Sequence, residues 1–210
     1  MEFMTDQSRV KSYFDEAAIG YSKRSHRGLW KWLRNNEARV ISRLIGGGEL
    51  GDVLELGSGD GYYANLLSQQ GCQSLICVDI SLEMLEQCSI PNCTKVVADI
   101  QEYLSQDRFN LILCAGALEF LQRPADVLRN AAQMLKDDGT FVVLMPRLSI
   151  LGRIYQLYHR VHGIPPRLFR LFEIRRWANE TGLHIVHWQE VPLFSLVVKF
   201  SKGVVSNEPK

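Results

Sequence analysis

The sequence predicts an α/β fold in which a largely parallel sheet is covered by helices on both faces. Three observations support this. Five short apolar runs alternate with helical segments between residues 53 and 145, and a glycine-rich turn stands where the first run meets the first helix. The runs are almost continuously apolar, which is typical of strands buried on both faces. Two further apolar runs follow, so we expect seven strands.

The elements are expected in a simple order along the chain. A helical segment over residues 9–43 has apolar residues at helical intervals and is ended by three glycines at 46–48. Five strands are then predicted at 53–56, 74–78, 95–98, 109–114 and 140–145. Helices are predicted between them at 62–70, 82–88 and 124–135.

The last part of the chain departs from this alternation. An insertion follows Pro146, a helix is predicted at 173–181, and two strands are predicted at 183–188 and 194–200. The connection between these strands is short, which suits an antiparallel hairpin. We therefore divide the chain into an N-terminal helical cover (1–45), a main domain (46–202) with an insertion at about 147–172, and a tail (203–210).

Composition excludes several classes of protein. The 210 residues carry 24 Lys and Arg against 23 Asp and Glu, a net charge of +1, and 46% are hydrophobic. Such a chain can bury a core, and its balance does not favour a dedicated nucleic-acid binder. No apolar run approaches the roughly 20 residues of a membrane span, and the N-terminus is polar. We expect a cytoplasmic protein without a secretory signal.

The five cysteines, at positions 72, 77, 88, 93 and 114, include no CxxC pair and are odd in number. This pattern indicates neither a disulfide framework nor a zinc site of ordinary spacing. We expect small buried side chains in a reducing compartment and no metal.

The glycine-rich turn spans Glu55 to Gly61 and carries glycines at 57, 59 and 61. Such a turn lets a ligand approach backbone N–H groups closely. Asp79 ends the next strand, where a carboxylate can accept hydrogen bonds from a ribose diol. The spacing is GxGxG rather than the dinucleotide GxGxxG. Glu55 would repel a pyrophosphate but attract a cationic amino-acid group.

These motifs resemble those of class I S-adenosylmethionine-dependent methyltransferases. The resemblance rests on segments 53–61, 77–81, 97–100, 113–120 and 135–140, and on an N-terminal helix with Tyr13, Phe14 and Tyr21. Within this family, the sequence is similar to the small-molecule group that includes the ubiquinone-biosynthesis and magnesium-protoporphyrin O-methyltransferases. The resemblance implies a Rossmann-like, doubly wound, seven-stranded sheet with its last strand antiparallel, N-terminal helices, and a helical lid after strand five.

The resemblance also implies S-adenosylmethionine as cofactor, S-adenosylhomocysteine as product, and a set of binding positions. These are Tyr13, Tyr21, Glu55, Gly57, Ser58, Gly59, Gly61, Asp79, Ile80, Met84, Asp99, Ile100, Cys114 and Gly116. Asp79 would bind the ribose and Asp99 the adenine amino group. The two tyrosines are equally compatible with a core role.

Methyl transfer needs a base only if the acceptor must lose a proton. Glu119, after the fourth strand, is the best candidate, although a role in the local helix is an alternative. Many relatives carry a histidine one residue later, where this chain has Phe120. No carboxylates or histidines near the fourth strand have metal-ligand spacing.

The near-zero net charge is the sum of opposed parts. Residues 9–43 and 147–176 each carry a net charge of +6, whereas residues 44–146 carry −9. In the resembled family the two basic segments roof the substrate pocket. We therefore expect an anionic or amphipathic small-molecule acceptor, methylated on O or N, or docking of the lid on an acidic partner or a membrane surface. An ordinary lid helix with a solvated basic face is the alternative.

Other functions remain open at this point. They are a nicotinamide-dependent oxidoreductase, a non-catalytic S-adenosylmethionine-binding protein, and a methyltransferase acting on tRNA or protein. No sequence-specific nucleic-acid binding is expected, and the protein is expected to be a monomer or a homodimer.

Overall fold

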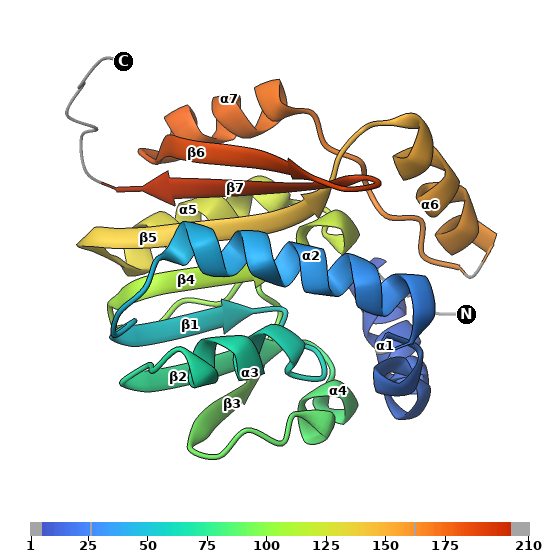
Figure 1. Cartoon of the computed structure of the whole chain (residues 1–210), viewed down its shortest axis with the longest axis horizontal. Helices are drawn as coiled ribbons and strands as arrows, with labels where there is room; N and C mark the ends of the chain where they lie inside the picture. The colour runs from blue at the N-terminus through green and yellow to red at the C-terminus, as the bar shows by residue number, and fades with distance from the viewer. Residues whose placement is uncertain (1–5, 26, 162, 203–210) are drawn as a thin grey trace.

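The computed structural model describes residues 6–25, 27–161 and 163–202, with side chains left out at 6 and 22–25. It has three layers, with a central sheet between two layers of helices (Figure 1). The predicted tail at 203–210 lies outside the described residues. Within the described part of the chain, no helix combines the length and apolar character needed to cross a membrane.

The sheet has seven strands in the order β3-β2-β1-β4-β5-β7-β6. The strands are β1 Asp52–Leu56, β2 Ser74–Asp79, β3 Cys93–Val97, β4 Phe109–Ala115, β5 Leu135–Pro146, β6 His184–Val191 and β7 Ser195–Ser201. The first five are mutually parallel, and β7 runs antiparallel to both of its neighbours. The predicted seven-stranded, Rossmann-like sheet with an antiparallel last strand is therefore confirmed.

The helices cover both faces and one end of this sheet. They are α1 Asp6–Ser25, α2 Gly28–Ile45, α3 Tyr62–Gln69, α4 Leu82–Gln87, the short 3-10 helix η1 Leu118–Phe120, α5 Pro124–Met134, α6 Ile150–Val161 and α7 Leu171–Thr181. The expected helical lid after strand five is α6. The helical segment predicted over 9–43 consists of two helices, α1 and α2, and Gly28 at the start of α2 has a left-handed φ of +55°.

The core follows from the alternation of side chains along buried strands. In β1, Leu54 and Leu56 face a cluster built with α5 and α7, whereas Val53 faces a second cluster built with α2 and α3. Phe141 and Phe200 stack between β5 and β7 in the first cluster, with ring centres 5.6 Å apart. Both sheet faces are thus covered.

Strand order reverses between β1 and β4, so their connections leave toward opposite faces at the carboxyl ends. Ligands in open α/β sheets bind in the crevice at this switch point. Here the crevice is covered by α1, which packs on α4, and α6 lies at the same end of the molecule (Figure 1).

Candidate active site

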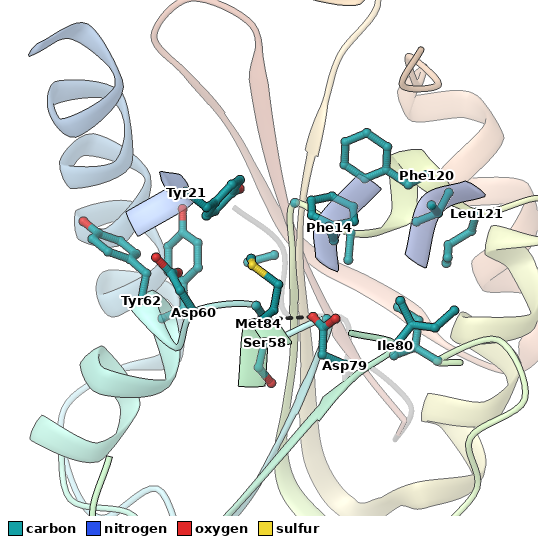
Figure 2. A pocket seen from close by; sticks show the side chains of 18 of the residues that line it. Phe14, Tyr21, Ser58, Asp60, Tyr62, Asp79, Ile80, Met84, Phe120 and Leu121 are labelled. Atoms are coloured by element: carbon teal, nitrogen blue, oxygen red, sulfur yellow. Dashed lines mark hydrogen bonds between the residues drawn. The ribbon is translucent and has the colours of Figure 1, made fainter. Parts of the chain in front are cut away.

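A cleft opens at the carboxyl ends of β1, β2 and β4, and α1 contributes Gln7, Val10, Phe14 and Tyr21 to its lining. Figure 2 shows side chains that line this cleft. Ten of the predicted cofactor residues line it: Tyr21, Gly57, Ser58, Gly59, Asp79, Ile80, Met84, Asp99, Ile100 and Gly116. These residues come from six different segments of the chain. The fold therefore assembles in one place most of the positions that the sequence motifs indicated.

The glycine turn is held against its neighbours by main-chain bonds. The N–H groups of Gly57 and Ser58 both donate to the carbonyl oxygen of Val78, at 2.8 and 3.0 Å. Gly57 has φ +75°, and a Cβ at this position would lie 2.3 Å from the Cβ of Ala117. Only glycine satisfies both conditions, because other residues are strained there and would collide with the loop after β4.

Asp79 fixes the relation between the glycine turn and the end of β2. Its carboxylate accepts hydrogen bonds from the N–H groups of Gly59 and Ser81, at 2.8 and 3.0 Å. The side chain is only 8% exposed. Burial raises the pKa of Asp79, although these backbone donors oppose the rise. The carboxylate thus stands in the cleft with its orientation fixed.

Asp99 has a similar local support. It accepts from the backbone N–H of Gln101 at 2.9 Å, and the Gln101 side-chain amide also donates to it. The amide oxygen of Gln101 in turn accepts from the Arg123 N–H at 2.7 Å. Asp99 and Ile100 therefore form a fixed wall of the cleft near the start of α5.

Arg34 is a site residue that the motifs did not indicate. It lies on α2 and lines both the cleft and a second cavity beside it. Its guanidinium carbon lies 4.8 Å from the ring centre of Tyr62 and 5.3 Å from that of Tyr21, and Nη2 donates to the Tyr21 hydroxyl. Asp60 is 3.8 Å from Nη1, which makes no hydrogen bond among the described residues. A buried cation with a spare donor suits an anionic group.

Four of the predicted cofactor residues lie outside the lining of this cleft. Glu55 and Cys114 are buried within the sheet. Gly61 directly precedes α3 and packs against Cys88, and Tyr13 lines the second cavity. Their cofactor-binding roles remain predictions.

The second cavity has a volume of about 590 Å³ and adjoins the cleft through shared residues such as Phe14, Tyr21 and Phe120. Aromatic side chains dominate its lining: Tyr13, Phe14, Tyr21, Trp30, Tyr63, Phe120, Tyr155, Tyr158 and Phe194. The lid contributes through Tyr155, whose ring stacks on Phe194 at 4.5 Å. The volume lies within the range of small-molecule sites.

Glu119 lies in this cavity, on the 3-10 helix after β4. It is 6% exposed, and its Oε2 has no hydrogen-bond partner among the described residues. Burial raises the pKa of Glu119 to about 8, because the charged form loses its hydration. A carboxyl group with this pKa exchanges a proton near neutral pH.

Glu37, a second buried carboxyl group, is also in the cavity and was not indicated by the sequence. It accepts hydrogen bonds from the hydroxyls of Tyr63 and Ser195, so it joins α2 to α3 and β7. Burial raises its pKa as well. Because both of its oxygens are engaged, Glu37 holds the wall of the cavity rather than offering a free base.

The basic residues of the predicted roof do not surround this cavity. Among the described residues that line it, Arg34 is the only arginine or lysine. Arg147 pairs with Glu190 on β6, and Arg167 pairs with Glu173 on α7. None of the described lid arginines therefore lines the space in which an acceptor would bind.

Comparison with known proteins gives a consistent result. A family model described as a methyltransferase domain matches residues 29–188. The nodulation protein S of Azorhizobium caulinodans is 28% identical over 146 residues, covering 65% of this chain and 70% of that protein. A ubiquinone biosynthesis O-methyltransferase of Leptothrix cholodnii is 23% identical, over 64% of this chain and 65% of its own length.

Among solved structures, the magnesium protoporphyrin IX methyltransferase of Synechocystis PCC 6803, with bound S-adenosylhomocysteine, superimposes with a TM-score of 0.73. It shares 15% identity, and the match covers 93% of this chain and 99% of that one. At this identity the match shows a common fold. The resemblance found in the sequence motifs is confirmed by these matches.

Proposed function

The protein belongs to the methyltransferase domain family, and on that premise we propose that it transfers a methyl group from S-adenosylmethionine to an oxygen or nitrogen of a small amphipathic acceptor. S-adenosylmethionine supplies an electrophilic methyl group, so the protein mainly positions the two reactants and excludes water. The single observation that carries the proposal is the pairing of a glycine-turn cleft with an adjoining aromatic cavity.

The residues of the cleft match the separate chemical groups of the methyl donor, S-adenosylmethionine. Asp79 has the position and fixed orientation to accept from a ribose diol, and Asp99 to accept from an exocyclic amino group. Arg34 borders the junction with the second cavity, and its Nη1, which makes no hydrogen bond among the described residues, suits the carboxylate of an amino-acid moiety. This assignment accounts for a buried guanidinium that its partners in the fold do not fully satisfy.

Glu119 supports a role for the protein in removing the acceptor's proton. A buried carboxylate with a pKa of about 8, and with one oxygen that has no hydrogen-bond partner in the described part of the chain, can take a proton from a hydroxyl or ammonium group in the cavity. Phe120, which stands where many relatives carry histidine, contributes only an aromatic wall. We therefore assign the base to Glu119.

The lining of the cavity favours an amphipathic acceptor over a strongly anionic one. Nine aromatic side chains surround it, and Arg34 is the one arginine or lysine among the described residues of its lining. An acceptor with an apolar ring or chain and one nucleophilic O or N fits this environment. Its size, about 590 Å³, is that of a small-molecule site and favours neither tRNA nor protein.

Calorimetric titration of S-adenosylhomocysteine tests the donor assignment. We expect the unaltered protein to bind S-adenosylhomocysteine and not NAD. Asp79→Ala should lower the affinity for S-adenosylhomocysteine at least about tenfold, because two hydrogen bonds to the ribose diol are lost. Asp107→Ala, at an exposed turn away from the cleft, is the control. Unchanged affinity in the Asp79 variant would show that the site lies elsewhere, and binding of NAD instead would favour an oxidoreductase.

A further inference from the structure

Three of the five cysteines converge at the edge of the sheet, outside the two cavities described above. The Sγ atoms of Cys77, Cys88 and Cys93 all lie within 4.8 Å of one another. Cys77 and Cys88 are buried and Cys93 is half-buried. Cys72 and Cys114 are not part of this group, so the convergence is specific to three positions.

The fold brings these residues together from three consecutive elements. Cys77 lies on β2, Cys88 directly follows α4, and Cys93 begins β3, which pairs with β2 in parallel. Their sequence spacing, with ten and four intervening residues, matches no common zinc motif. The spacing alone therefore predicted no metal, whereas the crossover from β2 through α4 to β3 creates the cluster.

We propose that Cys77, Cys88 and Cys93 form a thiolate site for a soft d10 metal ion, with Zn²⁺ as the reference ion. Zinc–sulfur bonds of about 2.3 Å place two ligand sulfurs roughly 3.8 Å apart in a tetrahedral site. The Cys77 and Cys93 sulfurs are 2.9 Å apart and the full set lies within 4.8 Å, so small side-chain rotations reach this spacing. Thiolates select soft ions over Mg²⁺ or Ca²⁺.

The surroundings of the cluster favour the thiolate form at one of its three positions, Cys88. The Cys93 thiol donates to the Cys77 sulfur, and hydrogen bonding within the cluster lowers the pKa of Cys88 while it raises that of Cys77. The positive charge of Lys95 favours the thiolate forms of Cys88 and Cys93, although the pKa of Cys93 stays raised, at about 11. Metal binding displaces the remaining thiol protons to solvent, and the half-buried side of Cys93 leaves a fourth position for water.

The cluster also touches the glycine turn of the donor cleft. A Cβ on Gly61 would lie 2.6 Å from the Cys88 sulfur, so Cys88 packs directly under the end of the turn. A metal held by Cys88 would fix the position of this contact. We therefore expect the metal to stabilise the folded chain.

The test is to titrate the reduced, metal-free full chain with each of two metal ions. Zn²⁺ binding is measured by competition with a chromophoric chelator, and Cd²⁺ binding by its sulfur-to-metal charge-transfer absorbance. We expect one ion per chain and a higher Tm with Zn²⁺. Cys93→Ser, at the half-buried position, should weaken Zn²⁺ binding by at least about tenfold, because a thiolate ligand is lost. Cys72→Ser is the matched control and should bind as the original chain does.

Three results would overturn the proposal. They are no binding of either ion by the reduced chain, binding that Cys93→Ser leaves unchanged, and binding that Cys72→Ser weakens equally. If Cys93→Ser fails to fold, Cys88→Ser tests the loss of a ligand at a second position.

Discussion

Glu119 owes its predicted chemistry to its surroundings rather than to its residue type. A carboxyl group in water ionises well below neutral pH, whereas this side chain is enclosed by the aromatic cavity and has a pKa of about 8. An acid of this strength can serve as a base because it is neither permanently ionised nor permanently protonated at the working pH.

The first prediction concerns catalysis by Glu119. Glu119→Gln keeps the shape of the side chain and removes the proton acceptor, so kcat should fall by about 10²-fold or more while S-adenosylhomocysteine binds as before. In the unaltered protein kcat should rise with pH toward a plateau above about 8, as Glu119 loses its proton. Steady-state kinetics on the identified acceptor measures both, and a fully active variant would remove Glu119 from the mechanism.

The same pKa has a consequence for stability. Because the folded-state pKa is raised from 4.5 to about 8, the folded chain holds a proton that the unfolded chain has released between these values. The stabilisation is complete below about pH 4.5 and is lost as pH rises through 8, by an amount of the order of a few kcal/mol.

Urea denaturation at pH 5 and pH 8.5 tests this second prediction. The free energy of unfolding of the unaltered protein should fall more steeply with pH than that of Glu119→Gln, which does not titrate. Glu86→Gln, on the exposed side of α4, is the control and should follow the unaltered protein. Parallel pH profiles for all three proteins would show that Glu119 is not held protonated by the fold.

Between elements, the most restrictive contact in the site joins the glycine turn after β1 to the loop after β4. Gly57 and Ala117 approach so closely that any side chain at position 57 displaces one of the two loops. The left-handed φ of +75° adds a conformational penalty of roughly 1–2 kcal/mol for a residue other than glycine.

The third prediction uses this contact. Gly57→Ala should weaken S-adenosylhomocysteine binding at least about tenfold, because the turn must move away from Ala117. Adding Ala117→Gly should restore part of the loss, but not the part caused by backbone strain. Calorimetry on both single variants and the double variant measures the coupling. Strictly additive effects would mean that the two loops do not constrain each other.

The elements also show what sequence can predict. Seven strands and the closing hairpin follow from local apolar runs and turn residues, the lid helix follows from the family resemblance, and Gly57 and Asp79 follow from motifs at strand ends. The role of Arg34 could not be predicted in this way, because its neighbouring sequence does not distinguish it from the other basic residues of the same helical region. Arg34 becomes a site residue only when α2 crosses the end of the sheet. The cysteine cluster is likewise created by the β2–α4–β3 crossover and not by spacing.

For the whole molecule, charge and exposed apolar surface occur together at one end. Both basic segments reach the end where α1, α6 and the start of α2 lie (Figure 1), while the central acidic part of the chain forms the body of the sheet. On α6 an apolar stripe of Ile150, Ile154, Leu157 and Val161 is 60–83% exposed. The exposed Arg153 and Arg160 accompany this stripe on the same helix.

We propose that this end docks on an anionic lipid surface, since an exposed apolar stripe with adjacent arginines is typical of interfacial helices. The opposite side of α6, with Tyr155, closes the acceptor cavity, so docking would bring the cavity beside the bilayer. An amphipathic acceptor partitions into that interface, which agrees with the aromatic lining of the cavity and with a lining to which none of the described lid arginines contributes.

The last prediction tests this docking by co-sedimentation with vesicles. Vesicles rich in phosphatidylserine should bind the protein at low salt, and binding should weaken as ionic strength rises and be weak on phosphatidylcholine alone. Leu157→Ser removes apolar area from the stripe and should reduce binding several-fold, whereas Leu104→Ser, at an exposed position in the loop before β4, should not. Failure to bind anionic vesicles would leave α6 as an ordinary lid. Binding that Leu157→Ser leaves unchanged would place the contact on another surface.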